Sequence, residues 1–487
     1  MFLRTVYPVD LSAPALYDAV AEEWWCYRDL EGRVEAMASQ LRGHRKRLAF
    51  CFCRNNFASV TAYLGAIEAG NAVALLDAGL PVDFQSRLLR LYLPEIVLSC
   101  GESADYRELS APGTIDRCEA GPVPECRVWT GKQTHQGALH PDLALLLSTS
   151  GSTGSPKLVR LTRRNVESNA ESICQALRIT ADDRAVGSLP LHYSYGLSVI
   201  NTHLMMGASL VLTDQGLVAP GFWSLVRKTR CTSFAGVPYS YQILHRLGLE
   251  SLDVPTLRTL TQAGGKLHNE LISEFGQLMT ARGGRFFVMY GQTEASARIT
   301  VLPPSSLPVK LGSVGLPVPG GQATIHVDGE TATEPNRAGE LIYTGPNVMM
   351  GYAGNREDLA AGDVLRGRLC TGDLASLDDE GFVYIQGRMK RDAKIFGFRL
   401  NLDELEAMVR VHGPSAVTSA GDSLFVFCEF GDPQEFLALA QELAGKLSLH
   451  HRAFRFFRVQ RLPTNANGKI DYSALLAMAA TREGRSG

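Results

Sequence analysis

The segment from Ser148 to Lys157 reads STSGSTGSPK and combines hydroxyl groups, glycines and one lysine. Glycines let backbone N–H groups approach phosphate oxygens, hydroxyls add hydrogen-bond donors, and a lysine adds a positive point charge. The segment follows an apolar run and precedes a helical pattern, so it lies at a strand-to-helix connection. This chemistry predicts an anion-binding loop. Its residues are Thr149, Ser150, Gly151, Ser152, Thr153, Gly154 and Lys157.

Two other interpretations of this loop must be weighed. A Walker A loop is disfavoured because Pro156 stands where the second glycine is required, and no Gly-Lys-Ser/Thr follows. A flexible surface loop built from turn-forming residues explains the composition equally well when the segment is taken alone.

Two later segments carry groups suited to a nucleotide. Tyr290-Gly-Gln-Thr-Glu294 follows the strand pattern RFFVM, which places it at the carboxyl end of a strand, where open α/β sheets bind their ligands. Asp373, in Thr371-Gly-Asp373, offers a carboxylate that can accept hydrogen bonds from two vicinal hydroxyls. Each segment alone also fits an ordinary polar turn, and the upstream loop favours the ligand-binding interpretation.

Further segments follow in a fixed order: Ala263-Gly-Gly-Lys266, Gly339 to Gly345 (GELIYTG), Gly387-Arg388, Lys394 to Arg399 (KIFGFR) and Pro463 to Lys469 (PTNANGK). Together with the loop, this set resembles the adenylate-forming superfamily, and most of all its stand-alone acyl-CoA synthetases. The resemblance covers about residues 45–475 and is far more specific than any single motif. One departure is Leu158, which stands where the family's loop often continues with glycine.

The resemblance implies a role for each matching residue of the nucleotide site. Tyr290 stacks on adenine, Thr293 contacts the α-phosphate, and Glu294 holds Mg²⁺. The remaining residues of the implied ATP site line the adenine pocket or contact the ribose and phosphates: Gly264, Gly265, Gly291, Asp373 and Arg388.

Three lysines near the C-terminus acquire roles only through the resemblance. Lys469 would bridge the substrate carboxylate and the α-phosphate in the transition state, although an exposed lysine after an Asn-Gly turn is usually just solvated. Lys390 would be the hinge between two domains. Lys394, with Gly397, would enter the site during thiol transfer, where glycine lets the pantetheine arm pass close to the backbone.

The acid pocket is expected at His192, Tyr193 and Gly236. Pro190-Leu-His-Tyr-Ser-Tyr-Gly196 stands where acyl-CoA synthetases commonly have Pro-x-Phe-His-x-x-Gly, so Tyr193 takes the usual histidine position. His192 then has either a gating role or a packed core position. No acidic residue lies nearby in the sequence to pair with an α-ammonium group, which argues against an α-amino acid substrate.

These groups must be positioned by alternating strand and helix patterns, which begin near residue 48 and predict an α/β fold with mostly parallel sheets. Short strands with Gly/Pro turns after Gly291 indicate a β subdomain, and the last hundred residues indicate a small α+β domain. We expect a large N-terminal domain of layered α/β sheets, residues 1–389, that binds ATP and the acyl substrate. A small mobile C-terminal lid, residues 390–487, carries the catalytic lysine.

Composition narrows the partners and the cellular location that the sequence allows. The 487 residues have a formal net charge of −2, which predicts no nucleic-acid partner, and no apolar run is long enough to span a membrane. The ten cysteines are scattered without zinc-site spacing and suggest buried thiols in a reducing cytoplasm.

The resemblance predicts an AMP-forming acid–thiol ligase. It would use ATP and Mg²⁺ to convert a small carboxylic acid to an acyl-adenylate with release of pyrophosphate, and then transfer the acyl group to a thiol. Coenzyme A in trans is the preferred acceptor. The alternative acceptor is a separate phosphopantetheinyl carrier protein. The alternative function is that of a catalytically dead nucleotide-binding homologue, and the presence of Lys469 counts against it.

The first prediction separates the two half-reactions. Lys469→Ala should abolish adenylation yet spare thioester formation from presynthesised acyl-adenylate, because the charge it neutralises develops only during adenylation. Lys390→Pro should keep adenylation and lose transfer, because proline fixes φ near −65° and restricts the hinge. Pyrophosphate and thioester assays measure the two steps, and thermal melts verify folding. The use of different domain positions for the two half-reactions would be contradicted if folded Lys469→Ala lost both steps, or if Lys390→Pro lost neither.

Overall fold

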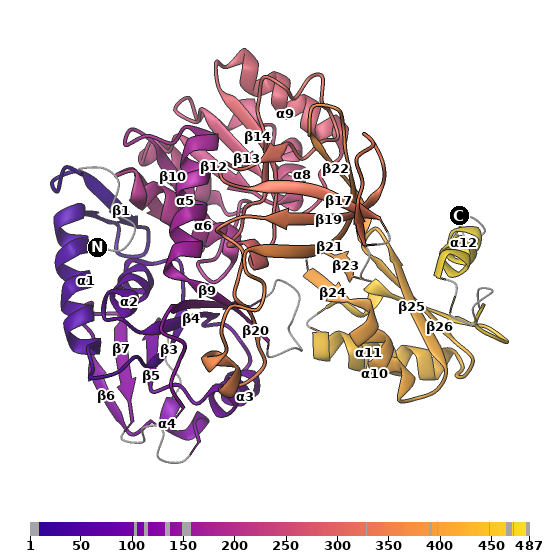
Figure 1. Ribbon diagram of the computed structural model, residues 1–487, viewed down its shortest axis with the longest axis horizontal. Coiled ribbons are helices and arrows are strands. Elements are labelled where there is room, and N and C mark those ends of the chain that lie inside the picture. The colour runs from indigo at the N-terminus through magenta and orange to yellow at the C-terminus, as the bar shows by residue number, and fades with distance from the viewer. Residues whose placement is uncertain are drawn as a thin grey trace. The chain divides into compact units, whose positions relative to one another are not determined.

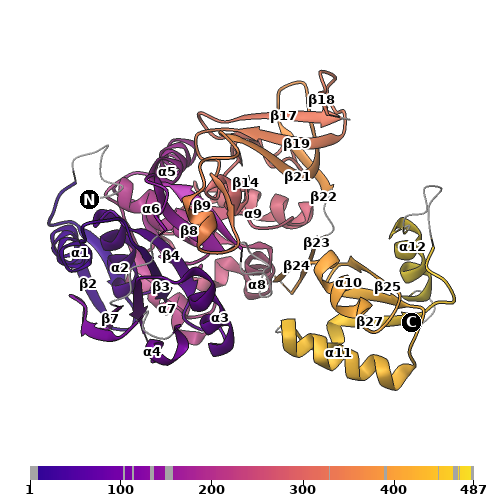
Figure 2. The ribbon, with the colours of Figure 1, turned by 60° about the horizontal axis from the view of Figure 1, so that its bottom comes forward.

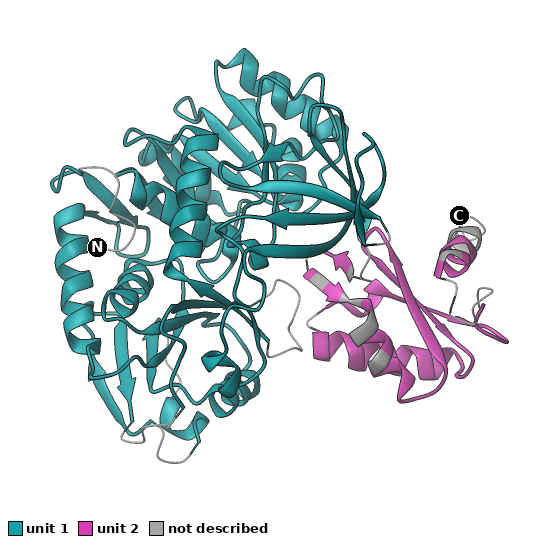
Figure 3. Cartoon of the chain, in the orientation of Figure 1, with its two compact units in different colours: residues 1–149, 156–387 teal, residues 150–155, 388–487 magenta. Residues whose placement is uncertain are grey.

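The structure is a computed structural model that describes residues 9–483, apart from 102–104, 112–114, 132–136, 149–156, 328, 389–391, 397, 448, 464–469 and 471. The chain forms two compact units (Figure 3). The larger contains residues 1–149 and 156–387, and the smaller contains residues 388–487. None of the helices in the described part of the chain is long and apolar enough to cross a membrane.

Sheet A of the larger unit has nine strands, six of which are neighbouring parallel strands (Figure 1). Strands β2, β15 and β16 add antiparallel edges. In spatial order the strands are β16 (Leu316–Pro317), β15 (Thr300–Leu302), β14 (Arg285–Tyr290), β13 (Thr259–Gln262), β12 (Ser233–Gly236), β10 (Arg184–Gly187), β11 (Ser209–Leu212), β1 (Pro14–Asp18) and β2 (Glu23–Cys26).

Sheet B has eight strands, with a parallel centre formed by β8, β4, β3 and β5 and antiparallel strands on both sides. In spatial order the strands are β20 (Gly351–Ala353), β9 (Leu158–Thr162), β8 (Leu143–Ser148), β4 (Ala72–Asp77), β3 (Leu48–Cys53), β5 (Ile96–Cys100), β7 (Cys126–Thr130) and β6 (Arg117–Ala120).

Helices cover both faces of both sheets, as buried parallel strands require. Strand β3 shows the pattern: Ala49, Cys51 and Cys53 pack in the core that sheets A and B share with α1, α2, α5 and α6, while the alternate residues pack in a second core with α3 and α4. Helices α7, α8 and α9 cover the other face of sheet A. The helices of this unit are α1 (Tyr27–Leu41), α2 (Phe57–Glu68), α3 (Val82–Tyr92), α4 (Tyr106–Leu109), α5 (Arg163–Leu177), α6 (Ser194–Met205), α7 (Pro220–Lys228), α8 (Pro238–Leu247) and α9 (Asn269–Ala281), with the 3₁₀ turns η1 (Leu249–Leu252), η2 (Thr293–Ala295) and η3 (Glu357–Ala360).

A third sheet, sheet C, completes the larger unit (Figure 2). Its strands are β18 (Glu330–Thr331), β17 (Gln322–Val327), β19 (Gly339–Thr344), β21 (Arg368–Leu377) and β22 (Val383–Arg388). Sheet C is the β subdomain expected after Gly291, and its longest strand, β21, carries Asp373.

The smaller unit is α+β. Strand β26 pairs antiparallel with β25 and parallel with β27, and helices α10 and α11 pack on one face of this sheet while α12 packs on the other. Its elements are β23 (Asp392–Ile395), β24 (Phe398–Asn401), α10 (Leu402–Arg410), β25 (Ser415–Ala420), β26 (Ser423–Cys428), α11 (Pro433–Leu447), η4 (His451–Ala453), β27 (Phe454–Arg458) and α12 (Tyr472–Glu483).

The predicted fold class is confirmed: the larger unit is mixed α/β with a β subdomain, and the C-terminal unit is a small α+β body. The structure divides the chain between residues 387 and 388, beside the predicted boundary at 389/390. The domain roles and the hinge at Lys390 stay predictions, because residues 389–391 lie outside the described residues.

A buried ion pair ties the end of sheet B to the segment after β20. Glu95 and Arg356 form two hydrogen bonds of 2.7 and 3.0 Å, and their side chains are only 5% and 6% exposed. Glu95 also accepts the Leu48 amide at 2.9 Å. Removing one partner leaves the other charge buried without compensation, which typically costs about 3–5 kcal/mol.

The second prediction tests this pair. Glu95→Met should destabilise the larger unit by about 3–5 kcal/mol, and Glu95→Met/Arg356→Met should recover a substantial part of that loss, because it removes the uncompensated charge. All four tryptophans lie in this unit, so urea unfolding followed by tryptophan fluorescence reports on it alone. A double variant no more stable than the single variant would contradict the prediction.

Candidate active site

Three predicted segments meet at one edge of sheet A. Strands β12, β13 and β14 are parallel neighbours, with Gly236 opposite Gln262 and Gln262 opposite Val288. Their carboxyl ends therefore lie side by side, and Gly236, Gly264 and Tyr290 lie at or just beyond those ends. This edge is where an open α/β sheet binds its ligand.

Tyr193 closes one side of this edge. It is the N-cap residue of α6, and its amide donates to the Pro190 carbonyl at 3.0 Å. A Cβ at Gly264 would lie 2.5 Å from the Tyr193 hydroxyl, and Gly264 has a φ of 82°, so only glycine fits there. Burial raises the pKa of the Tyr193 phenol, and the positive charge of Arg298 opposes this in part. Tyr193 is therefore neutral near pH 7.

His192 lies beside Tyr193 and is half-buried. Burial lowers the pKa of its imidazole, and the carboxylates of Asp77 and Asp214 offset that effect in part. The imidazole therefore loses its proton more readily than a solvated one and is neutral near pH 7. Whether it gates the pocket stays open.

The Tyr290 motif continues into a tight turn. The Thr293 hydroxyl lies 3.0 Å from the Ser194 hydroxyl, which brings the start of α6 against the turn. Glu294 is only 6% exposed, and its carboxylate accepts a 2.6 Å hydrogen bond from the Tyr352 hydroxyl of β20. The predicted phosphate- and metal-binding groups are thus held between α6 and β20.

The backbone of this turn is strained. Ser296 has a φ of 55° and Ala297 a φ of 109°, a conformation that L-residues rarely adopt and that costs about 1–3 kcal/mol per residue. Gly291 packs against the turn so closely that a Cβ there would lie 1.8 Å from the Ala297 carbonyl oxygen.

Two buried asparagines hold the strained turn. Asn169 of α5 pairs with the Arg298 backbone through its amide oxygen and nitrogen, at 3.2 and 2.9 Å. Asn347 donates to the carbonyls of Ala295 and Arg298 at 2.8 and 3.0 Å, and its own amide oxygen accepts from the Tyr343 hydroxyl. These hydrogen bonds offset the strain and fix where the side chains of the turn point.

Asp373 lies across from Tyr290. The Tyr290 hydroxyl donates to the Asp373 carboxylate, and Gln292 donates to the Thr371 carbonyl at 3.4 Å, so the end of β14 is tied to β21 of sheet C. Asp373 is 2% exposed. The groups predicted to contact adenine and ribose are therefore neighbours.

The remaining predicted site residues take no part in the contacts described above. Lys157 is exposed directly before β9, and Lys394 is exposed in β23 of the smaller unit. The other loop residues and two of the lysines lie outside the described residues, as does Gly397: Thr149, Ser150, Gly151, Ser152, Thr153, Gly154, Lys390 and Lys469. Arg388 ends β22, but its side chain is not described. All residue roles stay predictions.

Sequence reasoning missed Tyr352, Ser194, Asn169, Asn347 and Arg298. Ser194 lies in the Pro190–Gly196 segment, next to the predicted pocket residue Tyr193, so its place in the sequence was a signal for it. The contacts of the other four residues join parts of the chain whose spacing no helix or strand periodicity predicts.

The third prediction concerns Gly291. Gly291→Ala should displace the 293–298 turn and lower pyrophosphate release by about one to two decades, because the new methyl group would overlap the Ala297 carbonyl oxygen. Gly32→Ala in α1 is the matched control: its Cβ meets nothing within 4 Å, and alanine favours a helix interior by about 0.5–1 kcal/mol. Full activity in Gly291→Ala would show that the turn tolerates displacement.

Known proteins with similar sequences are acid–thiol ligases. The chain is 32% identical to a feruloyl-CoA synthase from Amycolatopsis sp, over 75% of this chain and 73% of that protein. It is 28% identical to an L-proline–[L-prolyl-carrier protein] ligase from Streptomyces coelicolor, over 92% and 91%. With an oxalate–CoA ligase from Arabidopsis thaliana it is 33% identical, over 56% of this chain and about half (53%) of that ligase.

A solved structure with the same architecture is an o-succinylbenzoate CoA synthetase from Bacillus subtilis, with a TM-score of 0.72, 25% identity and 95% of each chain covered. The family model described as "AMP-binding enzyme" matches residues 8–353. That match includes the whole carboxyl edge of sheet A and the Glu294 turn. The chain belongs to the AMP-binding enzyme family of adenylate-forming ligases.

Proposed function

We propose that this chain uses ATP to convert a carboxylic acid to an acyl-adenylate and then transfers the acyl group to coenzyme A. The observation that carries the proposal is the clustering of Tyr290, Thr293, Glu294 and Asp373 at the carboxyl edge of sheet A, in a chain of this family. These groups supply an aromatic face, a hydroxyl and two carboxylates.

The contact between Tyr290 and Asp373 supports one continuous nucleotide site. An adenine stacked on the Tyr290 ring places the attached ribose close to the Asp373 carboxylate, because the phenol already touches that carboxylate. The ribose hydroxyls would share the carboxylate with the phenol. Thr293 then faces the phosphates from the turn that follows.

Glu294 fits Mg²⁺ as the resident ion. One of its oxygens accepts the Tyr352 hydroxyl, which fixes the carboxylate, and no hydrogen bond from a described residue reaches the other oxygen, which would take the ion. Mg²⁺ is usually held by one or two carboxylates together with substrate phosphates and waters, so a dedicated protein cage is not required. When bound, the ion would offset phosphate charge.

The reaction follows from these groups in two steps. A substrate carboxylate oxygen attacks the α-phosphorus of ATP and pyrophosphate leaves, with Lys469 opposing the negative charge that develops. The thiolate of the acceptor then attacks the acyl carbon, and AMP leaves with its electron pair. Lys394 serves the second step.

Coenzyme A is the preferred acceptor, and a carrier protein is the second candidate. The relative that aligns over 92% of this chain is named for a carrier protein, whereas the feruloyl and oxalate relatives are named for coenzyme A. We also propose a cytoplasmic location, which agrees with the ten cysteines being free thiols.

One experiment separates these functions. Purified protein is incubated with ATP, Mg²⁺ and a panel of carboxylic acids, and pyrophosphate is measured. The activated acid is then offered coenzyme A or a phosphopantetheinylated carrier protein, and the thioester is measured. If a thioester forms only with the carrier protein, the acceptor is the carrier protein and not coenzyme A. If the protein binds ATP but releases pyrophosphate with none of the acids, the proposed function is overturned.

The fourth prediction tests the nucleotide site. Asp373→Ala and Glu294→Ala should each lower pyrophosphate release by about one to two decades, because a lost hydrogen bond to a charged group is worth ~1.5–3 kcal/mol. Asp379→Ala, at an exposed carboxylate after β21, is the control and should keep full activity. Wild-type rates in both site variants would contradict the assignment.

A further inference from the structure

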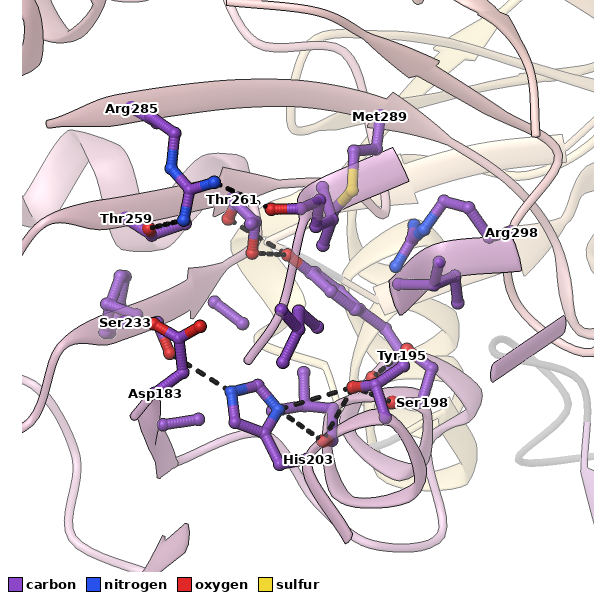
Figure 4. A pocket seen from close by; sticks show the side chains of 18 residues that line it. Asp183, Tyr195, Ser198, His203, Ser233, Thr259, Thr261, Arg285, Met289 and Arg298 are labelled. Atoms are coloured by element: carbon purple, nitrogen blue, oxygen red, sulfur yellow. Dashed lines mark hydrogen bonds between the residues drawn. The ribbon is translucent and has the colours of Figure 1, made fainter. Parts of the chain in front are cut away.

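Arg298 lines a partly open cavity of about 40 Å³ in the larger unit (Figure 4). The cavity lies between helices α5 and α6 and strands β10, β12, β13 and β14 of sheet A. Its volume is several times the roughly 10–15 Å³ that one water requires, so it can accept a group of several atoms. Arg298 follows the strained turn and is itself only 2% exposed.

The Arg298 guanidinium lacks an opposite charge among the described residues. None of their carboxylates pairs with it, and its buried Nε has no hydrogen-bond partner there. The guanidinium carbon lies 4.7 Å from the Tyr195 ring centroid, and this cation–π contact does not satisfy the buried Nε–H donor. Burial lowers the pKa of Arg298, yet a guanidinium remains charged at neutral pH.

The other ionic groups of the cavity wall have hydrogen-bond partners. Asp183 accepts from Arg258 at 2.9 Å, and the Arg285 guanidinium donates to the Leu177 carbonyl at 2.9 Å and to the Thr259 hydroxyl at 3.0 Å. His203 is hydrogen-bonded through Nδ1 to the Val199 carbonyl. Among the described residues of the wall, Arg298 therefore differs from Arg285 in that its guanidinium has neither a carboxylate partner nor a partner for its buried Nε–H.

This charge lies close to the proposed acid site. The rings of Tyr193 and Tyr195 meet edge to face with their centroids 6.3 Å apart. Ser194, which lies between them in the chain, contacts the Thr293 hydroxyl. One side of α6 therefore faces the reacting end of the substrate, and the next residues face the Arg298 cavity. Tyr193 and Arg298 are close enough to interact electrostatically, so an acid that reacts beside Thr293 and lies along Tyr193 would have its far end directed towards the guanidinium.

We infer that Arg298 binds a second anionic group of the acid substrate, so that the chain activates short acids with a second carboxylate in preference to simple monocarboxylates. The inference rests on the proposed function and names its substrate class. The bidentate fork of a guanidinium matches a carboxylate, and the carboxylate supplies the opposite charge that none of the described residues supplies. The same charge repels an ammonium group.

The fifth prediction compares linear diacids of four to six carbons with the monoacids of equal length in the pyrophosphate assay. Wild type should favour the diacids by about 10- to 100-fold in kcat/KM, the usual effect of a hydrogen bond to a charged group. Arg298→Met should reduce the diacids to the level of the monoacids and leave the monoacids unchanged. Equal losses for both classes would mean that Arg298 binds the reacting carboxylate, which overturns the inference.

Arg184→Met is the matched control. Arg184 also lies 4.7 Å from an aromatic centroid, that of Trp24, but its guanidinium donates to Ser209 and to the Thr229 carbonyl. This variant should lower the melting temperature without altering the preference for diacids. Arg298→Met should alter the preference without lowering the melting temperature, because it removes an uncompensated buried charge. A lowered melting temperature with unchanged preference would assign Arg298 a purely structural role.

A binding measurement separates this inference from the proposed function. Succinate, glutarate or adipate, without ATP, should raise the melting temperature of wild type and not of Arg298→Met, whereas the matched monoacids and chloride should raise neither. If diacids stabilise through Arg298 but no acid releases pyrophosphate, the anion subsite stands and the proposed function fails. If monoacids are activated and diacids are rejected, the proposed function stands and the inference fails.

Discussion

The strained turn from Thr293 to Arg298 is the constraint on which the site depends. Two consecutive non-glycine residues have positive φ, and such a conformation persists only where the surroundings over-determine it. Asn169 from α5 and Asn347 from the segment between β19 and β20 provide that support. The turn sets the positions of Thr293 and Glu294, the residues predicted to contact the phosphates and Mg²⁺, and of Arg298, which lines the cavity.

The anion subsite proposed above would make the charge pattern around this turn selective for the substrate. His192 and Tyr193 are neutral near pH 7, so they neither attract nor repel a charged acid strongly. Arg298 has no carboxylate partner among the described residues. A site built this way would discriminate through the cost of leaving that charge unmatched, and not only through a favourable contact with the right substrate.

The sequence predicted the fold well because the signals are local. The run LAFCFC from Leu48 to Cys53 is apolar throughout, as a strand buried on both faces must be, and the Tyr290 motif directly follows an apolar strand. The position of this motif at the carboxyl edge follows from the parallel pairing of the strands. The proximity of Tyr290 and Asp373 could partly be predicted from the sequence, because both residues were assigned to one nucleotide site.

The remaining features depend on contacts that no sequence period encodes. The Tyr352 hydroxyl reaches Glu294 from a strand of a different sheet. Arginine is a residue type that is usually exposed to solvent, yet the structure buries Arg298. Burial of a charge is decided by tertiary packing, which a hydropathy pattern does not contain.

The support given by Asn169 also has a consequence for the order in which the molecule assembles. Asn169 and Arg298 are separated by 129 residues, so the turn cannot gain its hydrogen bonds from its own neighbourhood in the chain. Closing so long a loop is entropically unfavourable until α5 has packed between the sheets. A partly folded chain can therefore possess most of its sheet structure and still lack the geometry for chemistry, which makes enzymatic competence a late event in folding.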